Sequence, residues 1–119
     1  MKARRRAAET RGRRGETLAA VWLVLKGYRV LERRARTPVG EIDLVARKGD
    51  LLAFVEVKAR RTLDAAAHAV TPTARIRLMR AAQAWTARRP WAAGLSMRFD
   101  LIAITPGQLP RHVRDAWRP

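Results

Sequence analysis

Two short β-branched segments, joined by a tight turn, constrain the fold of this chain more than any other feature. Residues 41–47 read EIDLVAR, residues 51–58 read LLAFVEVK, and Lys48-Gly49-Asp50 separates them. Short apolar runs divided by a glycine-containing turn are typical of a β-hairpin. Because both runs also contain acidic and basic residues, the hairpin is where we first look for a functional site.

The segments around the hairpin predict an α/β protein. Apolar residues recur at helical spacing over residues 15–26, and Gly27 can cap that helix. The further predicted elements are a strand at 28–36, one helical turn at 65–69, a helix at 72–88 that starts at the Thr71-Pro72 cap, a strand at 97–104 and a short terminal helix at 110–117. The order helix, three strands, helix and strand predicts a mixed sheet with helices packed on it.

The charge of the chain points to a polyanionic partner. The 119 residues, enough for one domain, carry a net charge of +16. Residues 1–14 contribute +6 and read as a flexible basic arm, whereas residues 15–119 form the single predicted domain and keep +10. Such a charge repels itself unless a polyanion is near, so nucleic acid is the expected partner. Anionic lipid and solvated disorder are the simpler alternatives.

Several classes of protein are excluded or disfavoured. The chain has no cysteine, which excludes disulfides, thiolate metal sites and cysteine nucleophiles. Its longest strongly apolar run, residues 18–25, falls short of the roughly 20 residues that span a bilayer, and its start lacks the pattern of a secretory signal. We therefore expect a cytoplasmic protein with no membrane partner. His68, His112 and Ser96 fit no catalytic or metal-binding pattern, and Asp100 reads as a structural residue bonded to an arginine.

Three ionisable residues in the hairpin are candidates for catalysis. Asp43 lies in the first run, and Glu56 and Lys58 lie in the second. Ionisable groups are unusual in such apolar strands, because buried charges need partners or a metal. Side chains alternate along a strand, so Glu56 and Lys58 share a face. If Asp43 pairs opposite Phe54, Asp43 lies on that same face with Glu56 as its diagonal neighbour, roughly 7–8 Å away. A shift of one residue would separate the two carboxylates.

These groups suit metal-dependent hydrolysis of a phosphodiester. Two carboxylates and a free backbone carbonyl, that of Val57, are hard oxygen ligands typical of Mg²⁺ or Mn²⁺ sites. The ion would activate water, and Lys58 could orient that water or neutralise developing charge. The Glu-x-Lys pattern is also common by chance, so a cross-strand ion pair on a solvated face remains the alternative. Glu41 is a candidate third ligand, although a solvent-facing acid at the strand end is the favoured interpretation.

The segments GEIDLVA at 40–46 and FVEVKAR at 54–60 resemble those of the YraN-type family of the restriction-endonuclease-like PD-(D/E)xK superfamily. Weaker similarity extends to Gly15-Glu16, Gly27-Tyr28, AVTP at 69–72 and RFD at 98–100. The resemblance implies a restriction-endonuclease-like fold, with Asp43 and Glu56 as metal ligands and Lys58 as the catalytic lysine. It also implies a helical glutamate, here Glu16, that faces the site. The alternative for Glu16 is a first-turn residue favoured by the helix dipole.

Three positions depart from the patterns of the family and superfamily. Ile42 stands where the superfamily has proline, although GEID is the family's own form. Arg34 stands where the family often has asparagine. Thr73-Ala74-Arg75 replaces a segment that usually contains a lysine early in the second helix, for which Arg75 or Arg77 is a candidate substitute.

Arginines of the second predicted helix indicate a phosphate-binding surface. No acidic residue occurs between Ala65 and Phe99, and the arginines lie opposite the apolar face of this helix. A solvated amphipathic face is the alternative. The expected nucleic-acid contacts are Arg60, Arg75, Arg77, Arg80 and Arg88.

Three functions are therefore open. The first is a Mg²⁺-dependent endonuclease that acts on DNA, branched or structured DNA included, through Asp43, Glu56 and Lys58. The second is a non-catalytic nucleic-acid-binding module that keeps the nuclease fold. The third is a basic RNA-associated protein in which the acidic cluster is only a structural ion network. Small enzymes of this fold often pair to present two sites, so a homodimer is compatible with the first.

Overall fold

A five-stranded sheet organises the computed structural model, which describes residues 2–118 and the side chains from residue 12 onward. The strands lie side by side in sequence order: β1 (Arg29–Thr37), β2 (Gly40–Lys48), β3 (Leu51–Ala59), β4 (Ser96–Ile104) and β5 (Arg111–Trp117). β3 and β4 pair parallel, and the other neighbours pair antiparallel. The mixed sheet expected from the sequence is confirmed.

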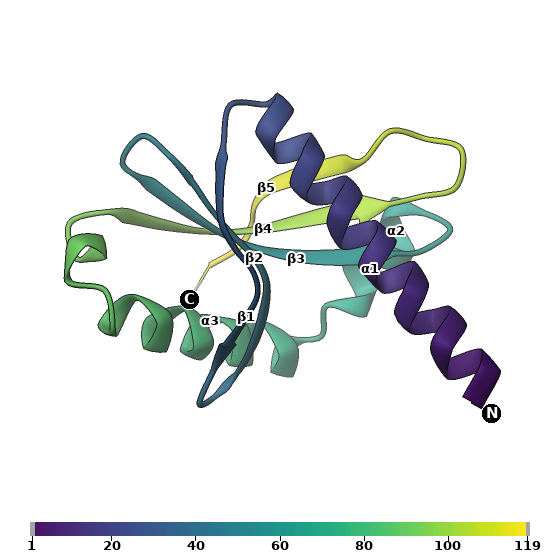
Figure 1. Cartoon of the computed structure of the whole chain (residues 1–119), viewed down its shortest axis with the longest axis horizontal. Coiled ribbons are helices and arrows are strands. Elements are labelled where there is room, and N and C mark those ends of the chain that lie inside the picture. Colours follow the sequence, from purple (N-terminus) through teal and green to yellow (C-terminus); the bar gives the residue numbers. More distant parts are fainter. Residues whose placement is uncertain (1, 119) are drawn as a thin grey trace.

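Helices cover both faces of this sheet (Figure 1). α1 (Lys2–Leu25) lies across one face and α3 (Pro72–Ala87) lies across the other. α2 (Leu63–Ala69) and the 3-10 helix η1 (Pro90–Ala92) flank α3 in the crossover from β3 to β4. Within the described residues, every helix is too short or too polar to cross a bilayer.

Alternate side chains of β3 enter two separate cores. Leu52 and Phe54 pack with Trp85 beneath α3, whereas Ala53 and Val55 belong to the core beneath α1. All four strand residues are fully buried. A strand covered on both faces reads as a continuous apolar run, which explains why this part of β3 shows no polar alternation in the sequence.

Both edge strands of the sheet are irregular. The register of β1 on β2 shifts between Val30 and Glu32, and that of β5 on β4 shifts between Phe99 and Leu101. β5 also contains Asp115, whose φ of 54° lies in the left-handed region. Such irregularities bend an edge strand and increase its twist.

The C-terminal segment is a strand, and the helix predicted over 110–117 is wrong. β5 bonds along the edge of β4 and sends neighbouring side chains to opposite faces of the sheet. His112 contacts the Tyr28 ring on the α1 side, while Val113 packs against the core beneath α3. Residues 111–117 form a strand because they pair with the edge of β4. That pairing is a long-range contact, which the local sequence does not reveal.

The start of the chain also differs from expectation. α1 begins at Lys2, well before the predicted start at residue 15, so the helix continues through residues 2–14. The flexibility of the basic segment, and the division into an arm and a domain, stay predictions. The start of α3 is confirmed, because the Thr71 hydroxyl accepts the Ala74 N–H at 3.1 Å.

Asp100 ties β5 to β4 from a fully buried position. Its Oδ1 accepts from Arg98 Nε at 2.8 Å and from the Asp115 N–H at 2.9 Å. Its Oδ2 accepts from Arg98 Nη2 at 2.7 Å and from His112 Nε2 at 2.8 Å. Burial alone raises the pKa of Asp100, but the hydrogen bonds from His112, Arg98 and Asp115 outweigh it and lower the pKa to about 2. The expected structural role and arginine partner are confirmed.

Replacing Asp100 by Asn should lower the free energy of unfolding at pH 7 by about 3–5 kcal/mol, as for other broken buried ion pairs. The folded-state pKa lies below the unfolded value, so the wild type should lose this contribution as the pH falls from about 4 toward 2, and the variant should not. Urea unfolding over that range measures both effects, with Asp64→Asn at an exposed carboxyl as the control. A loss below about 1 kcal/mol would contradict this role.

Candidate active site

The ladder between β2 and β3 opens at Asp43. Paired positions end at Leu44 and Val55. Asp43 directly precedes Leu44 on β2, and its Oδ2 accepts a hydrogen bond from the Val57 N–H at 2.8 Å. A side-chain carboxylate therefore bonds to β3 where the backbone ladder has ended, and this fixes Asp43 beside the residues that follow Val55.

The register differs by two residues from the predicted one. Phe54 pairs with Val45 and not with Asp43, so the pairing considered from the sequence does not occur. Continuing the observed register places Asp43 across from Glu56. The shift therefore brings Asp43 and Glu56 closer than the predicted diagonal arrangement. The alternation of side chains along β2 breaks at Asp43, because Ile42 and Val45 belong to the core beneath α3 whereas Leu44 belongs to the core beneath α1.

The other flank of Asp43 is irregular as well. On β1, Arg33 pairs with Leu44 and Ala35 pairs with Ile42, while Arg34 between them is unpaired and has a φ of 51°. A non-glycine residue in the left-handed region carries strain, which proteins keep mainly at functional sites.

The side chain of Arg34 connects β1 to α1. Its Nε donates to Oε2 of Glu16 at 2.7 Å, and the Glu16 side chain is only 12% exposed. The carboxyl of Glu16 raises the pKa of Arg34, although burial opposes this, and the charges of Glu41 and Asp43 act in the same direction as Glu16. Arg34 is therefore a cation placed among the acidic groups of the hairpin and the first helix.

Three of the predicted side chains of the site act electrostatically on the fourth, Asp43. Burial, followed by the charge of Glu56, raises the pKa of the Asp43 carboxyl to about 7. The Glu16 charge adds to this rise, whereas the Val57 hydrogen bond and the Lys58 charge oppose it. Nζ of Lys58 lies 3.2 Å from Oε1 of Glu56. The structure thus brings Asp43, Glu56, Lys58 and Glu16 to one end of the hairpin.

The oxygen donors at this end suit a divalent cation of the Mg²⁺ type. Among the residues whose side chains are described, no cluster of three or more His, Asp or Glu is close enough to hold a metal alone. Asp43 and Glu56 supply two carboxylates, and Mg²⁺ sites commonly use one or two carboxylates with water and substrate phosphate completing the shell. The carboxyl of Asp43, whose ionised form is disfavoured, is a group that a cation would stabilise.

Three of the five predicted phosphate-binding arginines lie exposed near this end of the sheet. Arg60 directly follows β3, and its Nη1 donates to the Ala59 carbonyl at 2.8 Å. Arg77 and Arg80 are exposed on α3 and line a groove with the turn residue Val39. These three side chains are free to contact an anion.

The other two predicted arginines lie elsewhere. Nε of Arg75 donates to the Val70 carbonyl at 3.1 Å, and its guanidinium lies 5.7 Å from the Trp117 ring. Arg88 is exposed at the C-cap of α3, which leads toward the start of β4 and so lies at the opposite end of the sheet from Lys58. We therefore assign neither of them to the site.

Arg34 is the residue that sequence analysis missed. Its charge and its polar neighbours are ordinary for an edge strand, and its positive φ cannot be inferred from the residue types around it. Its departure from the family's asparagine was the one available signal, because asparagine tolerates the left-handed conformation better than most residues.

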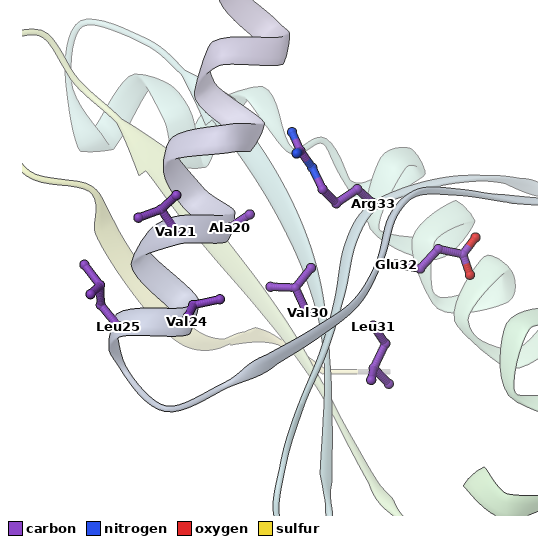
Figure 2. Close-up of a pocket in the computed structure, with 8 residues that line it drawn as sticks. All are labelled: Ala20, Val21, Val24, Leu25, Val30, Leu31, Glu32 and Arg33. Carbon is purple, nitrogen blue, oxygen red and sulfur yellow. The ribbon is translucent and has the colours of Figure 1, made fainter.

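An apolar groove of about 660 Å³ on the β1 side of α1 contains none of the candidate residues. Figure 2 shows Val30 on the α1 side of β1 and Glu32 on the side of α3. The carboxylate of Glu32 is already bonded to Trp85 Nε1 at 3.1 Å and to Arg89 Nη2 at 3.2 Å. We find no catalytic chemistry in this groove.

These features define an α/β protein whose mixed sheet holds two carboxylates and a lysine at an opened hairpin. The chain belongs to the family described as "Uncharacterised protein family UPF0102", whose model matches residues 15–104. The matched segment contains every candidate residue of the site.

The chain is similar along most of its length to several members of this family. It is 53% identical to a UPF0102 protein of Paramagnetospirillum magneticum over 94% of this chain and 90% of the relative. It is 55% identical to one of Rhizobium johnstonii over 95% of this chain and 93% of the relative. A UPF0102 protein of Parvibaculum lavamentivorans is 56% identical over 95% of this chain and 85% of the relative.

The Asp43→Asn substitution should stabilise the fold at alkaline pH. The raised pKa means that Asp43 supports folding below about pH 4, and that this support is lost as the pH rises through 7. An amide keeps an acceptor for the Val57 N–H without the charge. We expect the variant to be about 2 kcal/mol more stable than the wild type at pH 8, with the difference disappearing near pH 4.

Urea unfolding between pH 4 and pH 8 measures this difference, without added metal. Asp50→Asn, in the exposed hairpin turn, is the matched control and should show no such pH dependence. A difference between Asp43→Asn and wild type that is the same at every pH would contradict the assignment.

Proposed function

We propose that this protein is an endonuclease of the PD-(D/E)xK type, which hydrolyses phosphodiester bonds of DNA with the help of Mg²⁺ or Mn²⁺. The observation that supports this most is the Asp43 carboxyl, held beside Glu56 where the β2–β3 ladder opens. Two acidic groups are kept together there at a cost in free energy, which is typical of functional sites. The proposal includes branched or structured DNA as substrate.

The residues of the opened ladder have distinct roles in this proposal. The carboxylates of Asp43 and Glu56 and the carbonyl of Val57 would hold the ion. When bound, the ion supplies an activated water and neutralises charge on the phosphate. Lys58, whose side chain is 26% exposed beside Glu56, is placed to donate a hydrogen bond to the attacking water or to a phosphate oxygen.

Glu16 and Arg34 act on the same site from α1 and β1. The ion pair between them holds the Glu16 carboxylate close enough to raise the pKa of Asp43. In this role Arg34 positions Glu16 and limits the repulsion among the acidic groups. Its strained backbone is consistent with a conformation kept for this purpose.

DNA binding would rest on the exposed arginines around this end of the sheet. Arg60 directly follows β3, Arg77 and Arg80 lie on α3, and the chain has a net charge of +16. Contacts to phosphate fix the position of a nucleic acid without reading its sequence. The preference for DNA over RNA is carried only by the resemblance to the nuclease superfamily.

One observation favours the alternative of a non-catalytic nucleic-acid-binding module. Glu16 is already paired with Arg34, and Glu56 is already paired with Lys58. Two such pairs could make the cluster a self-contained ion network that needs no metal. Metal dependence separates the two functions, because only the nuclease requires it.

We expect purified protein to cleave DNA in the presence of Mg²⁺ or Mn²⁺ and not in EDTA. Asp43→Asn, Glu56→Gln and Lys58→Met should each reduce cleavage to background, because the activated water or the charge neutralisation is lost. Asp50→Asn should cleave like the wild type. The assay uses linear, single-stranded and branched DNA, and cleavage that survives in Asp43→Asn would refute the proposal.

Binding should respond oppositely to these variants when metal is absent. Asp43→Asn and Glu56→Gln remove charges that repel phosphate, so their affinity should equal or exceed that of the wild type. Arg77→Ala/Arg80→Ala should bind more weakly, with a salt slope reduced by about two units in a log–log plot. Arg88→Ala, at the exposed C-cap of α3, is the control. Fluorescence anisotropy at several salt concentrations measures both, and an unchanged slope in the double variant would exclude α3 from the interface.

A further inference from the structure

A second groove adjoins the proposed active site on the side of β4. It has a volume of about 720 Å³ and lies between the first described turns of α1, the ends of β3 and β4, and the loop at 105–108. Gly15 and Ala59 line it, and these residues are the direct neighbours of Glu16 and Lys58. The groove therefore adjoins the proposed active site along the backbones of α1 and β3.

The backbone of α1 lies close over the strand ends at this point. A Cβ atom added to Gly15 would lie 3.6 Å from Ile104 and 3.8 Å from Val57. The N–H of Val57 in turn bonds to Asp43. The packing of Gly15 against Val57 thus connects the α1 wall of the groove to the end of the β2–β3 ladder.

The groove combines cationic walls with an apolar floor. Arg14, Arg60 and Arg61 line it and are exposed, and no acidic residue is among its lining residues. Leu18, which is 51% exposed, and Ile104 supply apolar surface between these charges. Arginine is suited to phosphate because its planar fork of donors matches the phosphate oxygens.

These features match a single nucleotide rather than a duplex. Its phosphate would meet the arginines and its base would cover Leu18 and Ile104. A volume of this size is typical of sites for small ligands and is too small for paired strands. A base must leave its stack to enter such a site, which costs least where it is already unpaired.

We infer that this groove, between α1 and the ends of β3 and β4, binds an unpaired nucleotide next to the scissile phosphate. The substrate class is thus DNA that contains an unpaired nucleotide, such as a bulge or an overhang. The inference rests on the proposed nuclease function for its biological meaning. Its test uses binding without metal, so the two can fail separately.

The probes are two fluorescein-labelled DNA duplexes that differ only in one unpaired nucleotide. In EDTA, the wild type should bind the duplex with the unpaired nucleotide about tenfold more tightly than the blunt one. Leu18→Asp places a carboxylate in the floor of the groove and should abolish this preference. Leu25→Asp adds the same charge to the same helix at a 74% exposed residue of the groove in Figure 2, and it should keep the preference.

Equal binding of the two duplexes by the wild type, or an equal loss in both variants, would overturn the inference. Photocrosslinking with 4-thiothymidine at the unpaired position gives a readout that does not depend on a variant's folding. Crosslinks to the wild-type protein should map to peptides containing Leu18, Arg60 or Ile104, and crosslinks confined to α3 would contradict the groove. If the preference holds but no DNA is cleaved with Mg²⁺, the nuclease proposal fails and the nucleotide site stands.

Discussion

The hydrogen bond from the Val57 N–H to the Asp43 carboxylate is the interaction on which the rest of the site depends. It holds β2 and β3 together after their ladder has ended, and it places an ionisable group where two strands separate. Because this carboxylate is half-buried beside Glu56, the protein keeps it at an energetic cost. A cation bound beside this carboxylate would offset that cost, as the proposed nuclease requires.

The two cores on either side of β3 make this arrangement possible. Phe54 and Val55 are both fully buried, one in each core, so the strand that leads into the site is fixed on both faces. The residues immediately after them, from Glu56 to Ala59, are only half-buried. The buried part of β3 therefore ends directly before Glu56 and Lys58. A strand fixed on both faces restricts the positions of these side chains more than a surface strand would.

The sequence predicted the hairpin, the mixed sheet and the grouping of Asp43, Glu56 and Lys58, because these follow from short-range patterns. The pairing of Asp43 with Phe54, given only as a condition, does not occur, because the observed register continues with Asp43 across from Glu56. β5 and the early start of α1 were missed because each depends on long-range or weakly patterned features. Arg34 was missed because backbone strain is set by its neighbours in space, here Glu16 and the interrupted ladder.

The irregular margins of the sheet have a consequence for how the molecule behaves in a crowded solution. β1 and β5 each combine a shifted register with a residue in the left-handed conformation, Arg34 in one and Asp115 in the other. A foreign strand needs a straight row of donors and acceptors to extend a sheet, and neither margin offers one. The irregular edges thus disfavour edge-to-edge aggregation. In β1, the same irregular backbone also directs the Arg34 side chain toward Glu16.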